Sequence, residues 1–259
     1  YNIIILFVVY YNIFYLLLDC ITRSTVRLVH QYGKMGYPAA AFPVVEPFLL
    51  KRFDITDGRE SSVNLQLSFR DVKVEGLSDV KFDRIVGFER DPSKSKFEMY
   101  GSIPKIILHS KYVADGRILI LPIKGDGAAD IVLINPKFSV KFKPTTIPKN
   151  GKTYLMVDKL KVLHYLIFFM IIMCSFEMLF LLMHLFLNAF FHRMNIKLTN
   201  LFNGDAALGT NLNEFLNENW HEVWSELQPS IHVAIAEICK NVLRNMFTKF
   251  AYEDIYLED

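Results

Sequence analysis

The side chains able to do chemistry are scattered through this sequence. Seven histidines and three cysteines are spread over 259 residues, and none stands at the spacing of a known catalytic or metal motif. The chain has no Gly-x-Ser-x-Gly, no His-Glu-x-x-His and no Walker-type phosphate loop. A hydrolase of hydrophobic esters would need an activated nucleophile, so this class is disfavoured.

Three short features resemble functional motifs, but a purely structural role accounts better for each of them. Lys124-Gly125-Asp126-Gly127 faintly resembles a phosphate loop, but a hairpin turn accounts for its glycines. No second histidine follows His221-Glu222 at metal-ligand spacing, so we expect a solvent-facing pair. Cys239 lies beside the apolar stripe of a predicted helix, and we expect a small buried hydrophobic residue rather than a nucleophile.

The most regular element is a long amphipathic helix from Asn211 to Phe250. Its apolar residues recur at steps of three and four, with charged residues on the opposite face. Pro229 should kink this helix or break it in two. So wide an apolar face needs a partner surface. The main stripe consists of Leu216, Trp220, Val223, Leu227, Ile231, Ala234, Ile238, Val242 and Met246, and a second row of Trp224, Ile235, Leu243, Phe247 and Phe250.

The partner surface is predicted in the middle of the chain. From about Ser61 to Val162 apolar and polar residues alternate, as in antiparallel strands with one wet face. Two stretches, Ile118–Ile123 and Ile131–Ile134, are apolar on both faces. One face of this sheet is the natural partner of the helix. Turns are predicted at Asp91-Pro92, Asp115-Gly116, Gly125-Asp126-Gly127 and Asn150-Gly151.

The composition excludes one class of partner and reveals two unusual segments. The net charge of +2 gives no indication of nucleic-acid binding. Hydrophobic residues make up 52% of the chain, and residues 1–19 and 162–191 carry most of the excess. The second block contains a single charged residue, Glu177, and is long enough to span a bilayer. Because the first residue is Tyr rather than Met, we expect a fragment, a processed product or a defective gene model.

Several segments together resemble one protein family. The most specific is Asn219-Trp220 near the start of the long helix, preceded by the turn Asn203-Gly204. On these residues the chain resembles the takeout / juvenile-hormone-binding-protein family of insects, over about Cys20 to Lys161 and Arg193 to Asp259. The other matching segments are GYPAAAFPVVEPFLL, VKVEGLSD, the run from Gly101 through YVADGRILILPIKGDG, and LTNLFNGDAALGTNLNEFLNENWHEVWSELQP.

The resemblance implies an α+β fold of the tubular lipid-binding type, in which a strongly curved antiparallel sheet wraps a long C-terminal helix. It also implies a secreted, monomeric, non-enzymatic carrier without metal or cofactor. Its ligand would be a juvenile hormone, another terpenoid, a fatty acid or a quinone, held in an apolar tunnel between helix and sheet. The candidate tunnel residues are Trp220, Trp224, Leu227, Ile231 and Ile235 on the helix, and Phe69, Leu119, Leu121, Phe138 and Val140 on the strands.

Two segments depart from the family pattern and divide the chain. Residues 1–19 are unlike the family, lack the basic start and cleavage site of a signal peptide, and are marginal in length for a membrane span. Cys20 stands where the second cysteine of a family disulfide belongs, and its partner is missing from this chain. Residues 162–192 separate the family-like parts 20–161 and 193–259, which family members connect directly.

We interpret both apolar blocks as translated intron sequence. Phe, Leu, Ile, Tyr and Met codons dominate AT-rich introns, and Phe190-Phe191-His192-Arg193 fits a pyrimidine tract followed by an acceptor site. We expect the strands flanking residues 162–191 to share one sheet, which a membrane span of about 30 Å would pull apart. No membrane is therefore expected for the core domain. The alternative is a membrane-anchored interaction protein that uses residues 162–191 or 1–19 as its anchor.

Overall fold

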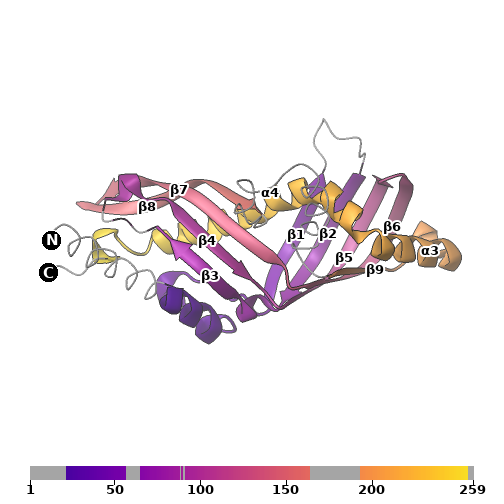
Figure 1. Ribbon diagram of the computed structural model, residues 1–259, viewed down its shortest axis with the longest axis horizontal. Coiled ribbons are helices and arrows are strands. Elements are labelled where there is room, and N and C mark those ends of the chain that lie inside the picture. Colours follow the sequence, from indigo (N-terminus) through magenta and orange to yellow (C-terminus); the bar gives the residue numbers. More distant parts are fainter. Residues whose placement is uncertain (1–21, 57–64, 88, 90, 164–192, 256–259) are drawn as a thin grey trace, which may run out of the picture.

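The computed structural model describes residues 22–56, 65–87, 89, 91–163 and 193–255. A helix covers residues 22–32, antiparallel strands follow, and two helices come last (Figure 1). This order confirms the predicted α+β class. The described strands are β1 (Phe48–Thr56), β2 (Leu65–Glu75), β3 (Lys81–Val86), β4 (Phe97–Ser102), β5 (Lys105–Ile118), β6 (Leu121–Ile134), β7 (Lys137–Lys149), β8 (Lys152–Leu163) and β9 (Arg193–Leu198), and the two C-terminal helices are α3 (Ala206–Glu218) and α4 (Trp220–Phe247).

The strands form two antiparallel sheets, with the orders β1-β2-β5-β6-β9 and β3-β4-β7-β8. The sheets meet where β4 continues into β5 and β6 continues into β7. At this junction Ile103 N donates to Pro136 O at 3.0 Å, and Asn135 N donates to Pro104 O at 2.8 Å. The two sheets are therefore halves of one curved antiparallel surface, joined by two chain segments that cross side by side (Figure 1).

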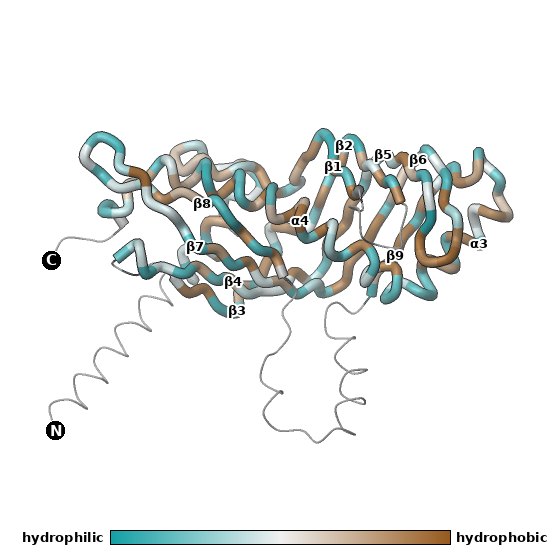
Figure 2. Tube along the Cα trace, turned by 90° about the horizontal axis from the view of Figure 1, so that it is seen from above, coloured by the Kyte–Doolittle hydropathy of each residue, from teal (hydrophilic) through white to brown (hydrophobic). Residues whose placement is uncertain are grey.

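Helix α4 runs along both halves of this surface, packing mainly on β8 and also on β1, while α3 packs on β9. Two apolar clusters lie beneath it. The cluster under the five-stranded sheet includes Leu216 and Val223, which are 1% and 0% exposed. The cluster under the four-stranded sheet contains the stacked rings of Phe97 and Phe142, with centroids 4.9 Å apart, and Phe247 of α4 packs against both. Figure 2 shows apolar stretches along α4 and along the strands that face it.

Two of the four predicted turns are confirmed. Asp91 caps a 3-10 turn at Pro92–Lys94, and Asn150-Gly151 closes the β7–β8 hairpin with positive φ at both residues. The predictions of turns at Asp115-Gly116 and Gly125-Asp126-Gly127 are wrong, because these residues lie inside β5 and β6. A side chain at Gly125 would collide with the hydroxyl of Tyr112, so this glycine allows a close approach within the sheet.

The prediction for Ile118–Ile123 is wrong as well. Instead of a strand apolar on both faces, this stretch turns the chain from β5 into β6, with Ile118 paired to Leu121. Leu119 has a φ of 53°, and Ile120 is 84% exposed. An aliphatic pair at a hairpin tip has no turn signature, so its sequence reads as strand.

The C-terminal helix starts earlier than predicted and breaks at a different residue. It begins at Ala206, where the Asp205 carboxylate accepts from Leu208 N at 3.0 Å. The break falls at Asn219, whose backbone and side-chain N–H groups both donate to Phe215 O at 2.9 Å. Pro229 lies inside α4 and does not divide it. The predicted break at Pro229 is wrong, because a proline removes only one backbone N–H and the helix continues through it. The alternative, a kink at Pro229, stays a prediction.

The strands that flank residues 164–192 correct another expectation. They do not share a sheet: β8 pairs with β7, and β9 pairs with β6. Both nevertheless follow the same edge of the continuous β6–β7 run, since Leu163 pairs with Ser139 and Arg193 pairs with Ile134. The five steps from Ile134 to Ser139 span at most about 17 Å, the length of fully extended chain. Four residues would bridge that distance.

A four-residue replacement of residues 164–192 should therefore keep β8 and β9 in register. We expect this variant to fold with strand and helix content equal to that of the described domain. A direct fusion of Leu163 to Arg193 places these residues about 3.8 Å apart, where the register requires up to about 17 Å, so it should displace β9 and lower the melting temperature. Circular dichroism and thermal melting compare the two variants. Equal stability would contradict the register argument.

Candidate ligand-binding site

The ten predicted tunnel residues divide between the two apolar clusters. Helix and strand candidates meet in each cluster, so the structure brings them together in two groups rather than one. Helix α4 passes from the first cluster to the second between Ile231 and Ile235. The first group comprises Trp220, Trp224, Leu227, Ile231, Phe69, Leu119 and Leu121, and the second comprises Ile235, Phe138 and Val140.

Burial separates core residues from residues with accessible surface. Phe69 and Val140 are buried, 4% and 7% exposed, and belong to the packed core. The other eight candidates are half-buried. Those eight contact a core cluster and still present apolar surface, which is the property expected of residues that line a ligand site. The enclosed tunnel itself stays a prediction.

The helix stripe is less buried than predicted. Leu216 and Val223 are buried against the sheet as expected. The expectation is wrong for the rest of the stripe, because α4 crosses from one half of the curved surface to the other and neither half covers its wide face completely. The half-buried members are Trp220, Leu227, Ile231, Ala234 and Ile238.

Two histidines lie against the tryptophans of α4. The ring of His221 stacks on Trp220 with centroids 3.5 Å apart, and its Nε2 is buried without a hydrogen-bond partner in the described part of the chain. The predicted solvent-facing pair is therefore wrong for His221, although Glu222 is exposed. His232 lies edge-on to Trp224, and burial lowers the pKa of its imidazole. Both rings can offer a polar anchor beside the apolar face.

Cys239 and the residue types that can hold a metal were the other candidates for chemistry among the described residues. Burial raises the pKa of the Cys239 thiol to about 11, so the thiol is protonated at neutral pH, in line with its interpretation as a small hydrophobic residue. Among the described residues, no group of three or more His, Cys, Asp and Glu could hold a metal ion. Within the same residues, no helix is both long and apolar enough to cross a membrane. Cys20 lies outside the described residues.

Sequence reasoning missed the polar contacts that hold the start of the helical region on the sheet. The Asn217 side chain accepts from Ile196 N at 2.8 Å and donates to Ile196 O at 2.7 Å. Asn213 makes the same two bonds to Leu198, at 2.8 and 2.9 Å. The i, i+4 spacing on α3 thus matches the two-residue repeat of β9. Two asparagines at this spacing in a helix, where Asn is unfavourable, were the available signal.

Asn217→Ala should reduce the free energy of unfolding by about 1–3 kcal/mol, because it leaves the N–H and C=O of Ile196 without partners. Urea denaturation measures the change. Asn211→Ala is the matched control, since Asn211 is an exposed asparagine on the same helix; it should change stability by less than about 0.5 kcal/mol. Equal effects of the two substitutions would show that the contact with β9 adds nothing.

Comparisons with known proteins agree with this geometry. The profile of the haemolymph juvenile hormone binding protein (JHBP) family matches residues 16–166 and 182–257. The circadian clock-controlled protein daywake of Drosophila melanogaster is 23% identical over 231 residues, which cover 87% of this chain and 79% of that protein. Its Drosophila yakuba counterpart is 23% identical over 244 residues, covering 92% and 83%. The crystal structure of Epiphyas postvittana Takeout 1 matches with a TM-score of 0.69 and 22% identity, covering 92% of this chain and 94% of that one.

Proposed function

Because the chain belongs to the haemolymph juvenile hormone binding protein family, we propose that it is a secreted carrier of a small lipophilic ligand. The ligand is a terpenoid such as a juvenile hormone, a fatty acid or a quinone. One observation carries the proposal: the apolar stripe of α4 contacts two core clusters, and yet its members from Trp220 to Ile238, apart from the buried Val223, stay half-buried.

The energetics of this stripe favour an apolar ligand. A ligand that covers apolar surface now in contact with water gains about 25 cal/mol of binding free energy for each Å² that it buries. Leu227 and Ile231 offer such surface beside the five-stranded sheet, and Ile235 offers it beside the four-stranded sheet. An elongated ligand lying along α4 would contact both clusters. The buried Nε2 of His221 provides one hydrogen-bonding group for a polar end.

The alternative functions fit less well. A membrane anchor formed by residues 162–191 would place its two ends about 30 Å apart. The pairing of β8 with β7 and of β9 with β6 holds Leu163 and Arg193 at most about 17 Å apart. A hydrolase would need an activated nucleophile, and the Cys239 thiol is protonated. The family is moreover a family of binding proteins.

A thermal-shift screen of juvenile hormone III, oleic acid and a short-chain ubiquinone tests the carrier function. A bound ligand at a hundredfold excess over its Kd should stabilise the protein by about 2.7 kcal/mol, with little dependence on salt. Ile231→Trp should reduce this stabilisation by filling the site. Val233→Trp, two residues away and 67% exposed, is the control and should bind normally.

The result against the proposal is equally definite. If no probe shifts the melting temperature and native mass spectrometry of the purified protein finds no co-purified lipophilic molecule, the chain is not a carrier of this kind.

A further inference from the structure

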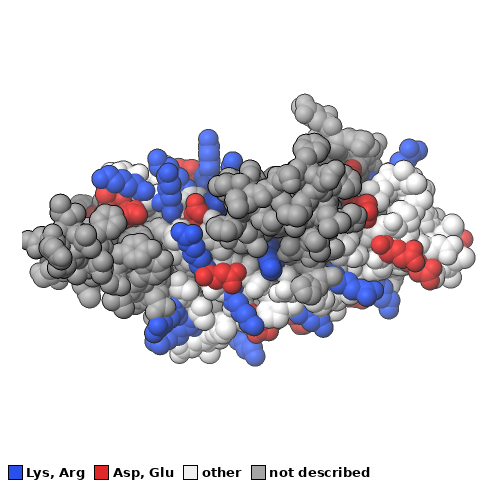
Figure 3. Space-filling view, in the orientation of Figure 1, with Lys and Arg blue, Asp and Glu red and all other residues white. Residues whose placement is uncertain are grey.

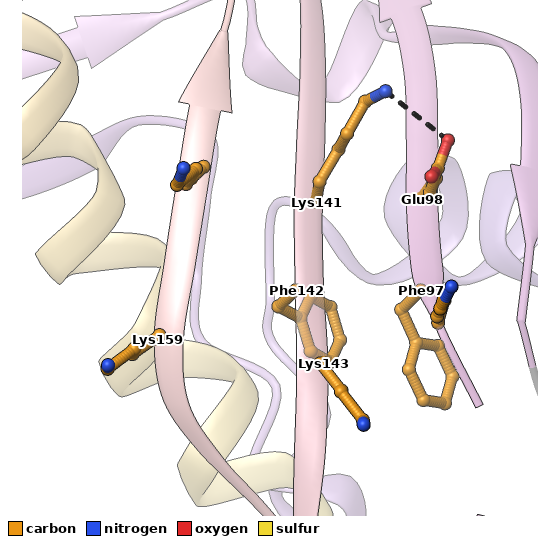
Figure 4. A pocket seen from close by; sticks show the side chains of 8 residues that line it. Phe97, Glu98, Lys141, Phe142, Lys143 and Lys159 are labelled. Carbon is orange, nitrogen blue, oxygen red and sulfur yellow. Dashed lines mark ion pairs between the residues drawn. The ribbon is translucent and has the colours of Figure 1, made fainter. Parts of the chain in front are cut away.

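The outer face of the four-stranded sheet carries a pocket that the carrier function does not use. Its volume is about 290 Å³, and it lies across β4, β7 and β8 (Figure 4). Figure 3 shows Lys and Arg side chains over the part of the molecule where Figure 1 draws these strands. The lining residues are Lys96, Phe97, Glu98, Lys141, Phe142, Lys143, Lys159 and Lys161.

The strand register concentrates positive charge in this pocket. Lys141 pairs directly with Lys161, and Lys143 pairs directly with Lys159. Like charges directly opposite each other destabilise a sheet. Lys141 is compensated, because its Nζ lies 3.4 Å from Glu98, whose carboxylate also accepts from the Tyr100 hydroxyl. The other four lysines are exposed and form no ion pair within the described residues.

A β-bulge produces this arrangement. Near the hairpin turn, Lys149 lies opposite Lys152 and Thr145 lies opposite Met156. If this register continued unchanged along the two strands, Lys143 would lie opposite Asp158. The register instead shifts by one residue between Lys143 and Thr145. Lys159 thereby faces outward beside Lys143. Bulges are frequent where a side chain is redirected for function.

The displaced acidic residue serves the opposite face. Asp158 accepts from the Thr145 hydroxyl at 2.7 Å and lies 3.7 Å from the guanidinium of Arg244 on α4. Asp158, which would have offset one of the lysine charges, thus contacts the helix instead, and the outer face keeps its positive charge.

The five-stranded sheet also carries like charges, since Arg70 lies opposite both Arg52 and Lys111. There, however, Arg52 forms an ion pair with Asp54, and Lys111 forms one with Asp71. There His109 lies opposite Asp130 at 2.6 Å, and Asp115 is paired with Lys124. Opposite charges across strands are therefore available to this chain, whose net charge is only +2. The lysine pocket differs in that four of its five lysines have no ion-pair partner among the described residues.

We propose that Lys96, Lys143, Lys159 and Lys161 form a binding site for a phosphate-bearing anion. Lysine ammonium groups bind phosphate as point charges, and the alkyl stems of these side chains line the pocket between them. The charge of five lysines and one glutamate calls for more than one phosphate group. A headgroup-sized ligand fits the volume of about 290 Å³. Its source is either an anionic phospholipid or a soluble polyphosphate, and the site is independent of the proposed carrier function.

The test uses the full chain, the variant Lys143→Gln/Lys159→Gln and the control Lys124→Gln/Lys197→Gln. The control removes two exposed lysines from the five-stranded sheet. Tripolyphosphate at a hundredfold excess over Kd should raise the melting temperature of the wild type by about 5 °C beyond sodium chloride of equal ionic strength. The pocket variant should lose this shift, and the control should keep it. Without any anion the pocket variant should melt no lower than the wild type, since repulsion is removed.

Vesicles identify the source of the phosphate. Sedimentation with phosphatidylcholine vesicles containing phosphatidylinositol 4,5-bisphosphate should weaken about 25-fold in the pocket variant, about fivefold for each lysine, if the source is a lipid headgroup. A tripolyphosphate shift without vesicle binding supports the soluble source. The proposal is overturned if the wild type responds to neither probe, or if the pocket variant and the control respond alike.

Discussion

The fold depends on the paired crossing of two chain segments at the junction of the sheets. Pro104 and Pro136 lack an N–H, so the regular ladder cannot run through these positions, yet their carbonyls accept from Asn135 and Ile103. The junction holds the two halves of the surface together while letting their strands diverge. Each half then has an apolar face to bury, and a helix of 28 residues, about 42 Å long, is the one described element that reaches both. The two clusters and the half-buried stripe follow from this geometry.

The free edge of β9 explains why a second, shorter helix precedes α4. An edge strand exposes N–H and C=O groups that can recruit another chain. The amides of Asn213 and Asn217 satisfy these groups at Leu198 and Ile196, in the way that a neighbouring strand would. The break at Asn219 then lets α4 take a different course along the sheet. The polar contacts fix where the helical region begins, and apolar contacts fix its course.

Local sequence patterns predicted the helix and the strands, but they did not predict which strands pair with one another. Alternation identified β2 and β7, and the step of three and four identified the helix, because each pattern depends on neighbours in the sequence. Gly125 was misread because its reason lies in Tyr112, a residue on another strand. The candidate residues of the helix and the strands meet in shared apolar clusters. Their division into two clusters depends on the bend at the junction, which no local pattern reports.

The lysine pairs show this limit most clearly. Periodicity placed the lysines of β7 on a wet face, and the turn at Asn150-Gly151 then predicts Lys143 opposite Asp158, an attractive pair. One bulge reverses that outcome by sending Asp158 to Arg244 and Lys159 outward. A single extra residue in a strand therefore couples the two faces of the sheet. Asp158 can form its ion pair with Arg244 of α4 because the bulge turns this carboxylate away from the outer face. Removing the bulge would lower the positive charge of the pocket and break the contact between Asp158 and Arg244, so the charge on one face and this contact on the other are parts of one arrangement.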